Sequence, residues 1–180
     1  MQVYDAKDLG SAFRTVRGNT IQIAEEIPEE KYDFRPAEGS RSVAETLRHI
    51  AVAPMWGIDV HGQRLTLLTF EMFKEGMAKQ AAEEAKLVTK ADILAALKEN
   101  GETYASFVES LSEEALADRV GFASGPHTKS RFEMVLSAKE HEMHHRAQLM
   151  LEERMLGIVP HLTRAMQERM AAMSKQAATA

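Results

Sequence analysis

The chain has 180 residues, of which 44% are hydrophobic and 27% charged, so it can bury a core of ordinary domain size. Its formal net charge of −5 argues against a nucleic-acid partner and against a polybasic membrane patch, because both need basic surfaces. The chain contains no cysteine, which excludes disulfides, thiolate zinc sites and a cysteine nucleophile.

Mostly apolar side chains recur every three or four residues from Ala6 to Ile27, which predicts the first helix. Pro28 ends this helix.

The N-terminal segment MQVYDAKDLG lacks the basic region and apolar core of a signal peptide, and no apolar run is long enough to span a bilayer. We therefore expect a cytoplasmic protein that does not enter the membrane.

The second predicted helix begins at Ser42 and ends near Arg64. Ser42 and Glu45 have the spacing of a capping box, in which each side chain bonds to the other residue's backbone N–H. Pro54 removes one helical hydrogen bond, so we expect a kink or break there. Residues 65–88 are apolar in part but fit no single period, and we expect a short helix or a loop lying over the bundle.

The third predicted helix runs from about Lys90 to Leu111, with Thr89 as its cap and Asp92 in its first turn. The following segment GFASGPHTK, residues 121–129, is rich in helix-breaking residues and is expected to be a loop.

The fourth predicted helix begins near Ser130, in another capping box, and ends near Leu156, before Gly157. Residues 162–173 contain good helix formers, and the tail from about residue 174 is expected to fray. Alternating strand patterns are scarce. The sequence thus predicts an all-α four-helix bundle in one domain, residues 1–180, with an additional C-terminal helical segment.

His141 and His145 are four residues apart, so they lie on one face of the fourth helix and can converge on one ion. His49 lies on a mostly apolar stripe of the second helix, which should face inward. Neutral imidazoles bind zinc, nickel, copper or iron, and three of them leave a position open for water or substrate. We therefore predict a catalytic type of metal site held by these three histidines.

The spacing alone leaves a structural alternative open, in which His141 is exposed and His145 forms a hydrogen bond in the core. His144 also lies near the same face, but the four-residue spacing favours His145. His61, His127 and His161 have no evident partner and are expected at the surface or in loops.

Residues 141–145 also match H-E-x-x-H, the zinc metalloprotease signature, in which the glutamate (here Glu142) activates water. The downstream extension of that signature is absent, because RAQLMLEERM follows. No strands that would line a protease cleft are evident. Glu142 is otherwise expected to be a solvated residue of a charged helix.

Two segments resemble the DinB-like, or DinB/YfiT-like, family of metal-dependent proteins. YDFRPAEGSRSVAETLRHIA resembles the segment that leads into the family's second helix and holds its first metal histidine. HEMHHRAQL resembles its fourth-helix motif of histidine, three residues, histidine, arginine, any residue and glutamine. The resemblance spans roughly Leu9 to Pro160, with Ala147 where the family often has glycine.

This resemblance implies a four-helix bundle with an unusual connection, commonly a homodimer. It implies a divalent ion such as zinc, nickel or iron, held here by His49, His141 and His145. Some relatives are thiol-dependent S-transferases or isomerases, and the family name implies no DNA binding.

We therefore expect a metal-dependent enzyme, such as a thiol-dependent S-transferase or a hydrolase. In the first case a low-molecular-weight thiol would bind the ion as thiolate and attack a small electrophilic substrate. Catalytic residues stay unassigned, with Glu45, Glu142 and Gln148 as candidates and Trp56 expected in the core. The alternatives are a non-catalytic metal-binding stress-response protein, the HExxH-type metalloprotease and a helical interaction module without metal.

Overall fold

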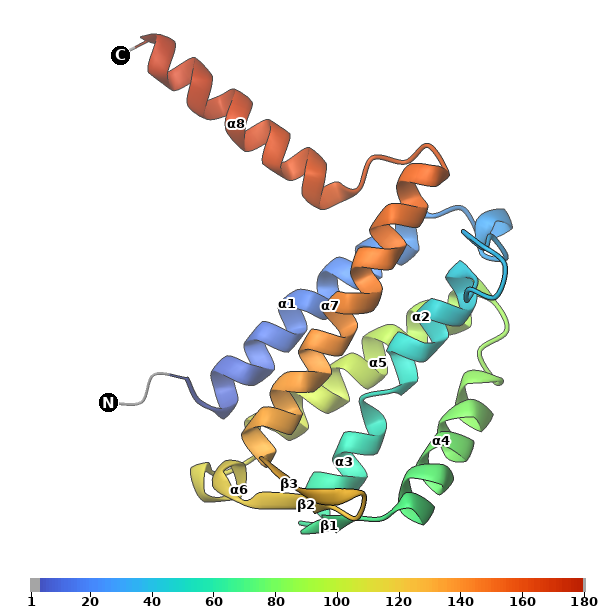
Figure 1. Cartoon of the computed structure of the whole chain (residues 1–180). Helices are drawn as coiled ribbons and strands as arrows, with labels where there is room; N and C mark the ends of the chain where they lie inside the picture. The colour runs from blue at the N-terminus through green and yellow to red at the C-terminus, as the bar shows by residue number, and fades with distance from the viewer. Residues whose placement is uncertain (1–3, 180) are drawn as a thin grey trace.

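Side chains that cap the first turn determine where the long helices begin. The computed structural model describes residues 4–179, and Figure 1 shows that most of them are helical. Four helices start in capping boxes, which satisfy backbone N–H groups that lack a partner within the helix. These boxes pair Asp5 with Asp8, Ser42 with Glu45, Thr89 with Asp92, and Ser130 with Glu133. The predicted helix starts at residues 42, 89 and 130 are thereby confirmed.

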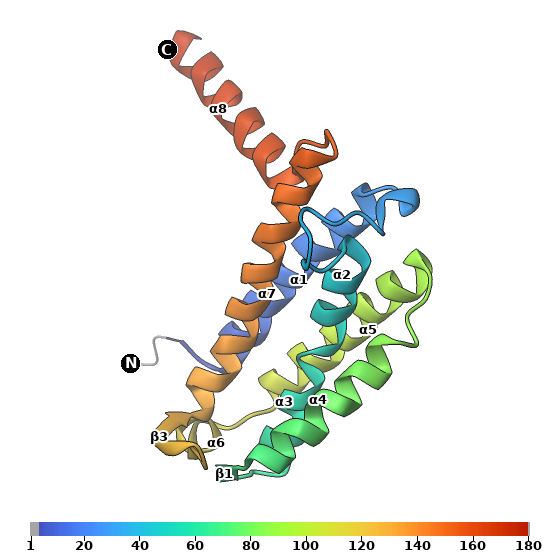
Figure 2. The same cartoon turned by 45° about the vertical axis from the view of Figure 1, so that its right-hand side comes forward.

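The bundle consists of α1 (Ala6–Glu26), α2 (Val43–Val52), α5 (Lys90–Glu109) and α7 (Arg131–Met155). Helix α1 contacts α5 and α7, and α2 contacts the same two helices. The four helices therefore pack side by side, as Figures 1 and 2 show from two directions. The prediction of a helical bundle is confirmed.

The predicted second helix is broken at Pro54, as expected. Helix α2 ends at Val52, and the chain continues after the proline as α3 (Met55–Gly62). Because Pro54 has no N–H to donate, it separates α2 from α3.

A short 3-10 turn, η1 (Glu29–Lys31), follows the end of α1.

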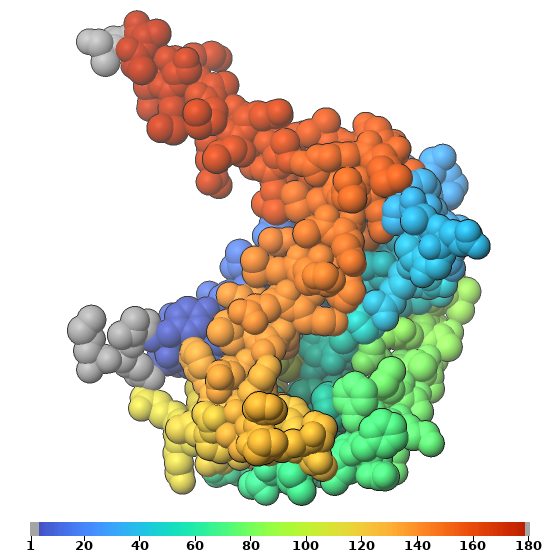
Figure 3. Space-filling model, in the orientation of Figure 1, coloured from blue at the N-terminus to red at the C-terminus, as the bar shows by residue number. Residues whose placement is uncertain are grey.

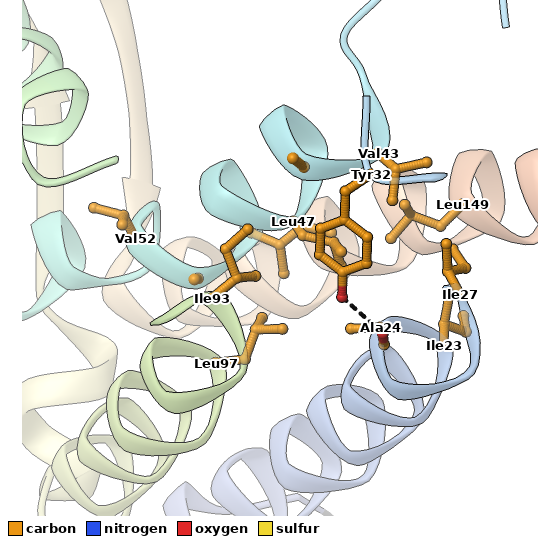
Figure 4. Packing of buried hydrophobic residues seen from close by; sticks show 13 residues of the cluster. Ile23, Ala24, Ile27, Tyr32, Val43, Leu47, Val52, Ile93, Leu97 and Leu149 are labelled. Atoms are coloured by element: carbon orange, nitrogen blue, oxygen red, sulfur yellow. Dashed lines mark hydrogen bonds between the residues drawn. The ribbon is translucent and has the colours of Figure 1, made fainter. Parts of the chain in front are cut away.

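The largest buried cluster fixes α2 against α1, α5 and α7 (Figure 4). The hydroxyl of Tyr32 donates a 2.7 Å hydrogen bond to the carbonyl oxygen of Ala24, so this buried polar group is satisfied. Leu47 of α2 and Leu149 of α7 both have no exposed surface. Since these residues lie close in sequence to His49 and His145, the core also fixes how the two helices meet at the histidines.

Residues 65–88 contain a short strand, β1 (Leu67–Leu68), and helix α4 (Phe70–Glu84), which confirms the short helix that was one of the two expectations. Helix α4 lies against α2 on the outside of the bundle (Figure 2). None of its residues is fully buried, and Phe73 and Met77 keep 50% and 58% of their surface exposed. This shallow packing explains why the segment shows no clean apolar period.

The expectation of a loop over residues 121–129 is wrong. Strands β2 (Arg119–Phe122) and β3 (Gly125–Ser130) pair antiparallel, and β1 pairs parallel to β2 at the end of the bundle. A short helix, α6 (Glu113–Ala117), precedes them. Val120 is fully buried, and β3 is almost wholly exposed, so strands this short show no alternating pattern in the sequence.

The C-terminal helix α8 (His161–Thr179) projects away from the bundle after the end of α7 (Figures 1 and 3). The predicted additional helical segment is thus present, and it continues beyond Met173 into the residues expected to fray. Within residues 4–179, none of the helices has the length and apolar character needed to cross a bilayer.

Candidate metal centre

Three histidine side chains from two helices meet beside α4. The Nε2 atom of His141 lies 3.1 Å from Nε2 of His49 and 3.2 Å from Nε2 of His145. The nitrogen atoms that these three rings offer as ligands all lie within 4.8 Å of one another. Two of the rings come from successive turns of α7 and the third from α2, as the spacing and the inward-facing stripe predicted.

Polar side chains contact the far side of two of the rings. Nδ1 of His49 lies 3.2 Å from a carboxylate oxygen of Glu84, and Nδ1 of His145 lies 2.8 Å from the amide oxygen of Gln148. The Gln148 oxygen only accepts, so Nδ1 of His145 carries the hydrogen and its Nε2 presents a lone pair. The amide nitrogen of Gln80, a donor, lies 2.8 Å from Nδ1 of His49 and also bonds to Glu84, so this ring has both a donor and an acceptor beside Nδ1 and either of its tautomers finds a partner.

The three Nε2 atoms cannot all satisfy one another by hydrogen bonds. Nε2 of His145 carries no hydrogen, and Nε2 of neutral His141 can either donate one hydrogen or accept one, so His141 satisfies only one of its two neighbours. Two nitrogen ligands of a tetrahedral ion at about 2.05 Å lie roughly 3.3–3.4 Å apart, close to the two separations seen here. The three residues therefore fit a divalent metal ion.

The surroundings also keep the imidazoles in the neutral form that binds metal. Burial, together with the neighbouring histidines, lowers the pKa of His141 to about 4. Burial likewise lowers the pKa of His49 and of His145, and the charge of Arg41 contributes to both shifts. Neutral imidazoles are thus available near pH 7 without a proton having to leave first.

Two cavities lie beside the histidine centre. One, of about 340 Å³, lies between His49 and α4, and its walls include Arg41, Trp56, Phe73 and Met77. The other, of about 250 Å³, lies beside His145; it is lined by Pro36, Ser40, Arg41, Thr46, Gln148, Leu151 and Glu152 as well. A larger cavity of about 560 Å³ between α3, α4 and α5 shares Trp56 with the first, but no histidine lines it. Trp56, expected in the core, therefore forms a cavity wall.

Glu142 does not face this centre. Glu142 is 1% exposed and forms a buried ion pair with Arg17, whose Nη2 lies 2.9 Å from a carboxylate oxygen. Thr20 donates a further 2.7 Å hydrogen bond to the same carboxylate. The expectation of a solvated Glu142 is wrong, because its partners come from α1, more than 120 residues away in sequence. To activate water as in the metalloprotease motif, this carboxylate would have to leave its ion pair.

The other two catalytic candidates, Glu45 and Gln148, bond to residues close to them in sequence. Glu45 caps α2 through the backbone N–H of Ser42 and pairs with Arg35. That side-chain bond to Arg35, together with the backbone bond to Ser42, lowers the pKa of Glu45 to about 2, which makes it a weak proton acceptor. Gln148 bonds to His145, so it orients a ring of the centre.

The remaining histidines divide into exposed and buried. His144 is exposed and outside the three-histidine group, and His127 is exposed on β3. The expectation that His61 and His161 lie at the surface or in loops is wrong, since they keep only 3% and 7% of their surface exposed. His61 lies against the guanidinium of Arg131, and His161 bonds to Asn19 of α1, so each has a partner far away in sequence.

Sequence reasoning missed Arg41, Gln80 and Glu84. Gln80 and Glu84 are one helical turn apart on α4, a spacing that could have suggested a shared face. Nothing local connects that face to His49, because the contact depends on how α4 packs against α2.

The comparisons with known proteins agree with this architecture. A family model described as DinB superfamily matches residues 12–149. The protein YjoA of Bacillus subtilis is 29% identical over 152 residues, which cover 82% of this chain and 88% of YjoA. The crystal structure of YjoA, described as DinB-like, superimposes with a TM-score of 0.63 at 24% identity, covering 83% of this chain and 91% of that one.

A second solved structure is YfiT of Bacillus subtilis, described as "a probable metal-dependent hydrolase with an unusual four-helix bundle topology". It superimposes with a TM-score of 0.68 at 15% identity over 85% of this chain and 88% of YfiT, a likeness in fold. The family match covers most of the bundle and all three histidines and leaves α8 outside. The chain belongs to the DinB superfamily.

Proposed function

We propose that this protein is a metal-dependent enzyme whose divalent ion is held by His49, His141 and His145. The observation that carries the proposal is the convergence of three imidazole nitrogens, next to two cavities of which one is lined by His49 and the other by His145. Zinc, nickel and iron all suit such imidazole ligands. When bound, the ion would supply Lewis-acid activation of a nucleophile at its open position.

The protein's own residues would hold and orient the rest of the reaction. Glu84 and Gln148 contact Nδ1 of two imidazole rings and orient them, and such partners raise metal affinity. Trp56 and Phe73 pack edge to face and form an apolar wall beside His49, which limits the access of water from that side. Arg41 and Gln148 supply polar groups for a bound molecule.

Transfer of a thiol to a small electrophile is the first candidate reaction. A thiol needs no strong base, because coordination by itself favours the thiolate. Glu45 and Glu142, the two carboxylates considered from the sequence as catalytic candidates, are both engaged in ion pairs and are therefore poor bases. A reaction that needs no strong base fits this arrangement better. With no cysteine in the chain, the sulfur must come from a low-molecular-weight cosubstrate.

Hydrolysis is the second candidate, and the description of YfiT as a probable metal-dependent hydrolase favours it. Turnover assays with thiols present and absent separate the two reactions. A protein that binds metal and turns over neither class of substrate would instead fit the non-catalytic metal-binding alternative.

The deciding experiment is elemental analysis of protein purified without an affinity tag. We expect close to one divalent ion per chain, and loss of that ion in His145→Ala but not in the matched variant His144→Ala. A content below about 0.1 ion per chain, with no uptake of added zinc or nickel, would contradict the proposal, because a preformed three-ligand site fills nearly completely. If His145→Ala abolishes turnover but barely lowers the melting temperature, the ion is catalytic.

A further inference from the structure

Arg41 stands at the rim of the histidine centre without a partner. Its side chain lines both cavities, the one beside His49 and the one beside His145. Within residues 4–179 it forms no hydrogen bond or ion pair, and it is exposed. Its neighbours in sequence differ, since Arg35 pairs with Glu45 and Arg48 bonds to a backbone carbonyl. A guanidinium with all its donors free is suited to bind an oxyanion in a bidentate manner.

The charge balance around the centre favours an anion. Three neutral imidazoles leave the two positive charges of a bound ion unbalanced, and Arg41 adds a third. Glu84 supplies one negative charge at His49 and is already bonded to Gln80. Glu152 lines the second cavity, but burial raises its pKa to about 7, so near neutral pH much of it is protonated and can donate to a ligand oxygen.

We propose that Arg41 anchors an acidic group of the substrate or cosubstrate. The ligand is then a small molecule that carries a carboxylate, sulfonate or phosphate a few atoms away from the group that reacts at the histidine centre. Its apolar part packs against Trp56, Phe73 and Met77 in the cavity beneath α4. This inference rests on the proposed function and specifies its substrate class.

Two thiols of similar length test the anchor in the cobalt-loaded protein. 2-Mercaptoethanesulfonate carries a permanent negative charge and 2-mercaptoethanol is neutral, and the sulfur-to-cobalt charge-transfer absorption reports the binding of either. We expect the wild-type protein to bind the sulfonate about tenfold more tightly, in keeping with a charge-assisted hydrogen-bonded pair. In Arg41→Gln the preference should fall below about twofold while the affinity for mercaptoethanol stays within a factor of two, as expected when only a charged contact is removed.

The matched control is Arg169→Gln, which removes the same charge from the exposed surface of α8 and should keep the full preference. The anchor alone is refuted if both thiols bind but wild-type protein shows no preference, or if Arg41→Gln keeps it. A protein that takes up no cobalt, or whose cobalt spectrum neither thiol changes, refutes the open metal position of the proposed function and the anchor with it.

Discussion

Replacing Glu142 by alanine leaves the guanidinium of Arg17 in the core with no carboxylate to neutralise it. The two side chains are 3% and 1% exposed, so water cannot take over the lost interaction. Nε of Arg17 donates to both carboxylate oxygens at 2.9 and 3.0 Å, and the other two nitrogens bond to the carbonyls of Leu97 and Ile50. Arg17 therefore cannot swing out to solvent without breaking contacts to α5 and α2 as well.

The expected loss follows from this burial. Removing one partner of a buried ion pair destabilises a protein by about 3–5 kcal/mol, because the remaining charge is left uncompensated. In a domain of this size each kcal/mol lowers the melting temperature by about 2–4 °C, so Glu142→Ala should melt about 6–20 °C below wild type. The double variant Arg17→Met/Glu142→Met should lose less than the sum of the two single variants, since no buried charge remains.

Thermal unfolding followed by circular dichroism, on metal-free protein at pH 7, measures these differences without any contribution from a bound ion. The control is Glu140→Ala, an exposed glutamate two residues earlier on α7, which should change stability by less than about 0.5 kcal/mol. A Glu142→Ala variant that melts within 2 °C of wild type would refute the structural role of the ion pair. It would also make Glu142 available again as a base in the metalloprotease interpretation.

Further changes test the rest of the molecule. Glu84→Gln should weaken metal binding about 10–100-fold, measured by competition with a chelator, because the carboxylate beside Nδ1 of His49 loses its charge. Gly76→Ala would place a Cβ 2.8 Å from Nε1 of Trp56, so the indole and α4 must move apart, and we expect faster hydrogen exchange of the α4 amides. Burial lowers the pKa of His61 from 6.5 to about 4. The contribution of neutral His61 to the stability of the fold is therefore complete above pH 6.5 and is lost as the pH falls toward 4. In His61→Gln the melting temperature should depend less on pH between pH 7 and 4.5. The homodimer that the family resemblance implies stays a prediction, and sedimentation equilibrium giving the monomer mass would contradict it.

Local signals were sufficient for most of the helical framework. The first helix was predicted over residues 6–27 and spans Ala6–Glu26 in the structure. The break after α2 was predicted from the presence of Pro54 alone. Capping boxes and prolines act through their immediate neighbours, so one sequence carries all the information needed. The spacing of His141 and His145 is of the same kind, since a helix alone puts them on one face.

Contacts between distant segments could not be predicted in this way. Val120 of β2 packs in a buried cluster with Val60 and Leu68, which holds the β2–β3 hairpin against the bundle. The sequence of the hairpin itself does not show this contact. The burial of His61 likewise depends on Arg131, 70 residues away. His49 was placed correctly by its apolar stripe, but the residues that orient it lie on α4, whose sequence has no regular period.

The ion pair of Glu142 also bears on the metal centre, because of where α7 directs successive residues. A step of one residue turns the helix by about 100°, so His141 faces His49 of α2 while Glu142 faces α1. Arg17 then bonds to the carbonyl of Ile50, the residue after His49. The pair therefore ties the backbone of α2 to α7 one residue away from both of the histidines that meet there. Glu142 is in this view a positioning residue: its loss should lower metal affinity by displacing His49, even in protein that remains folded, whereas a water-activating glutamate would leave the ion in place.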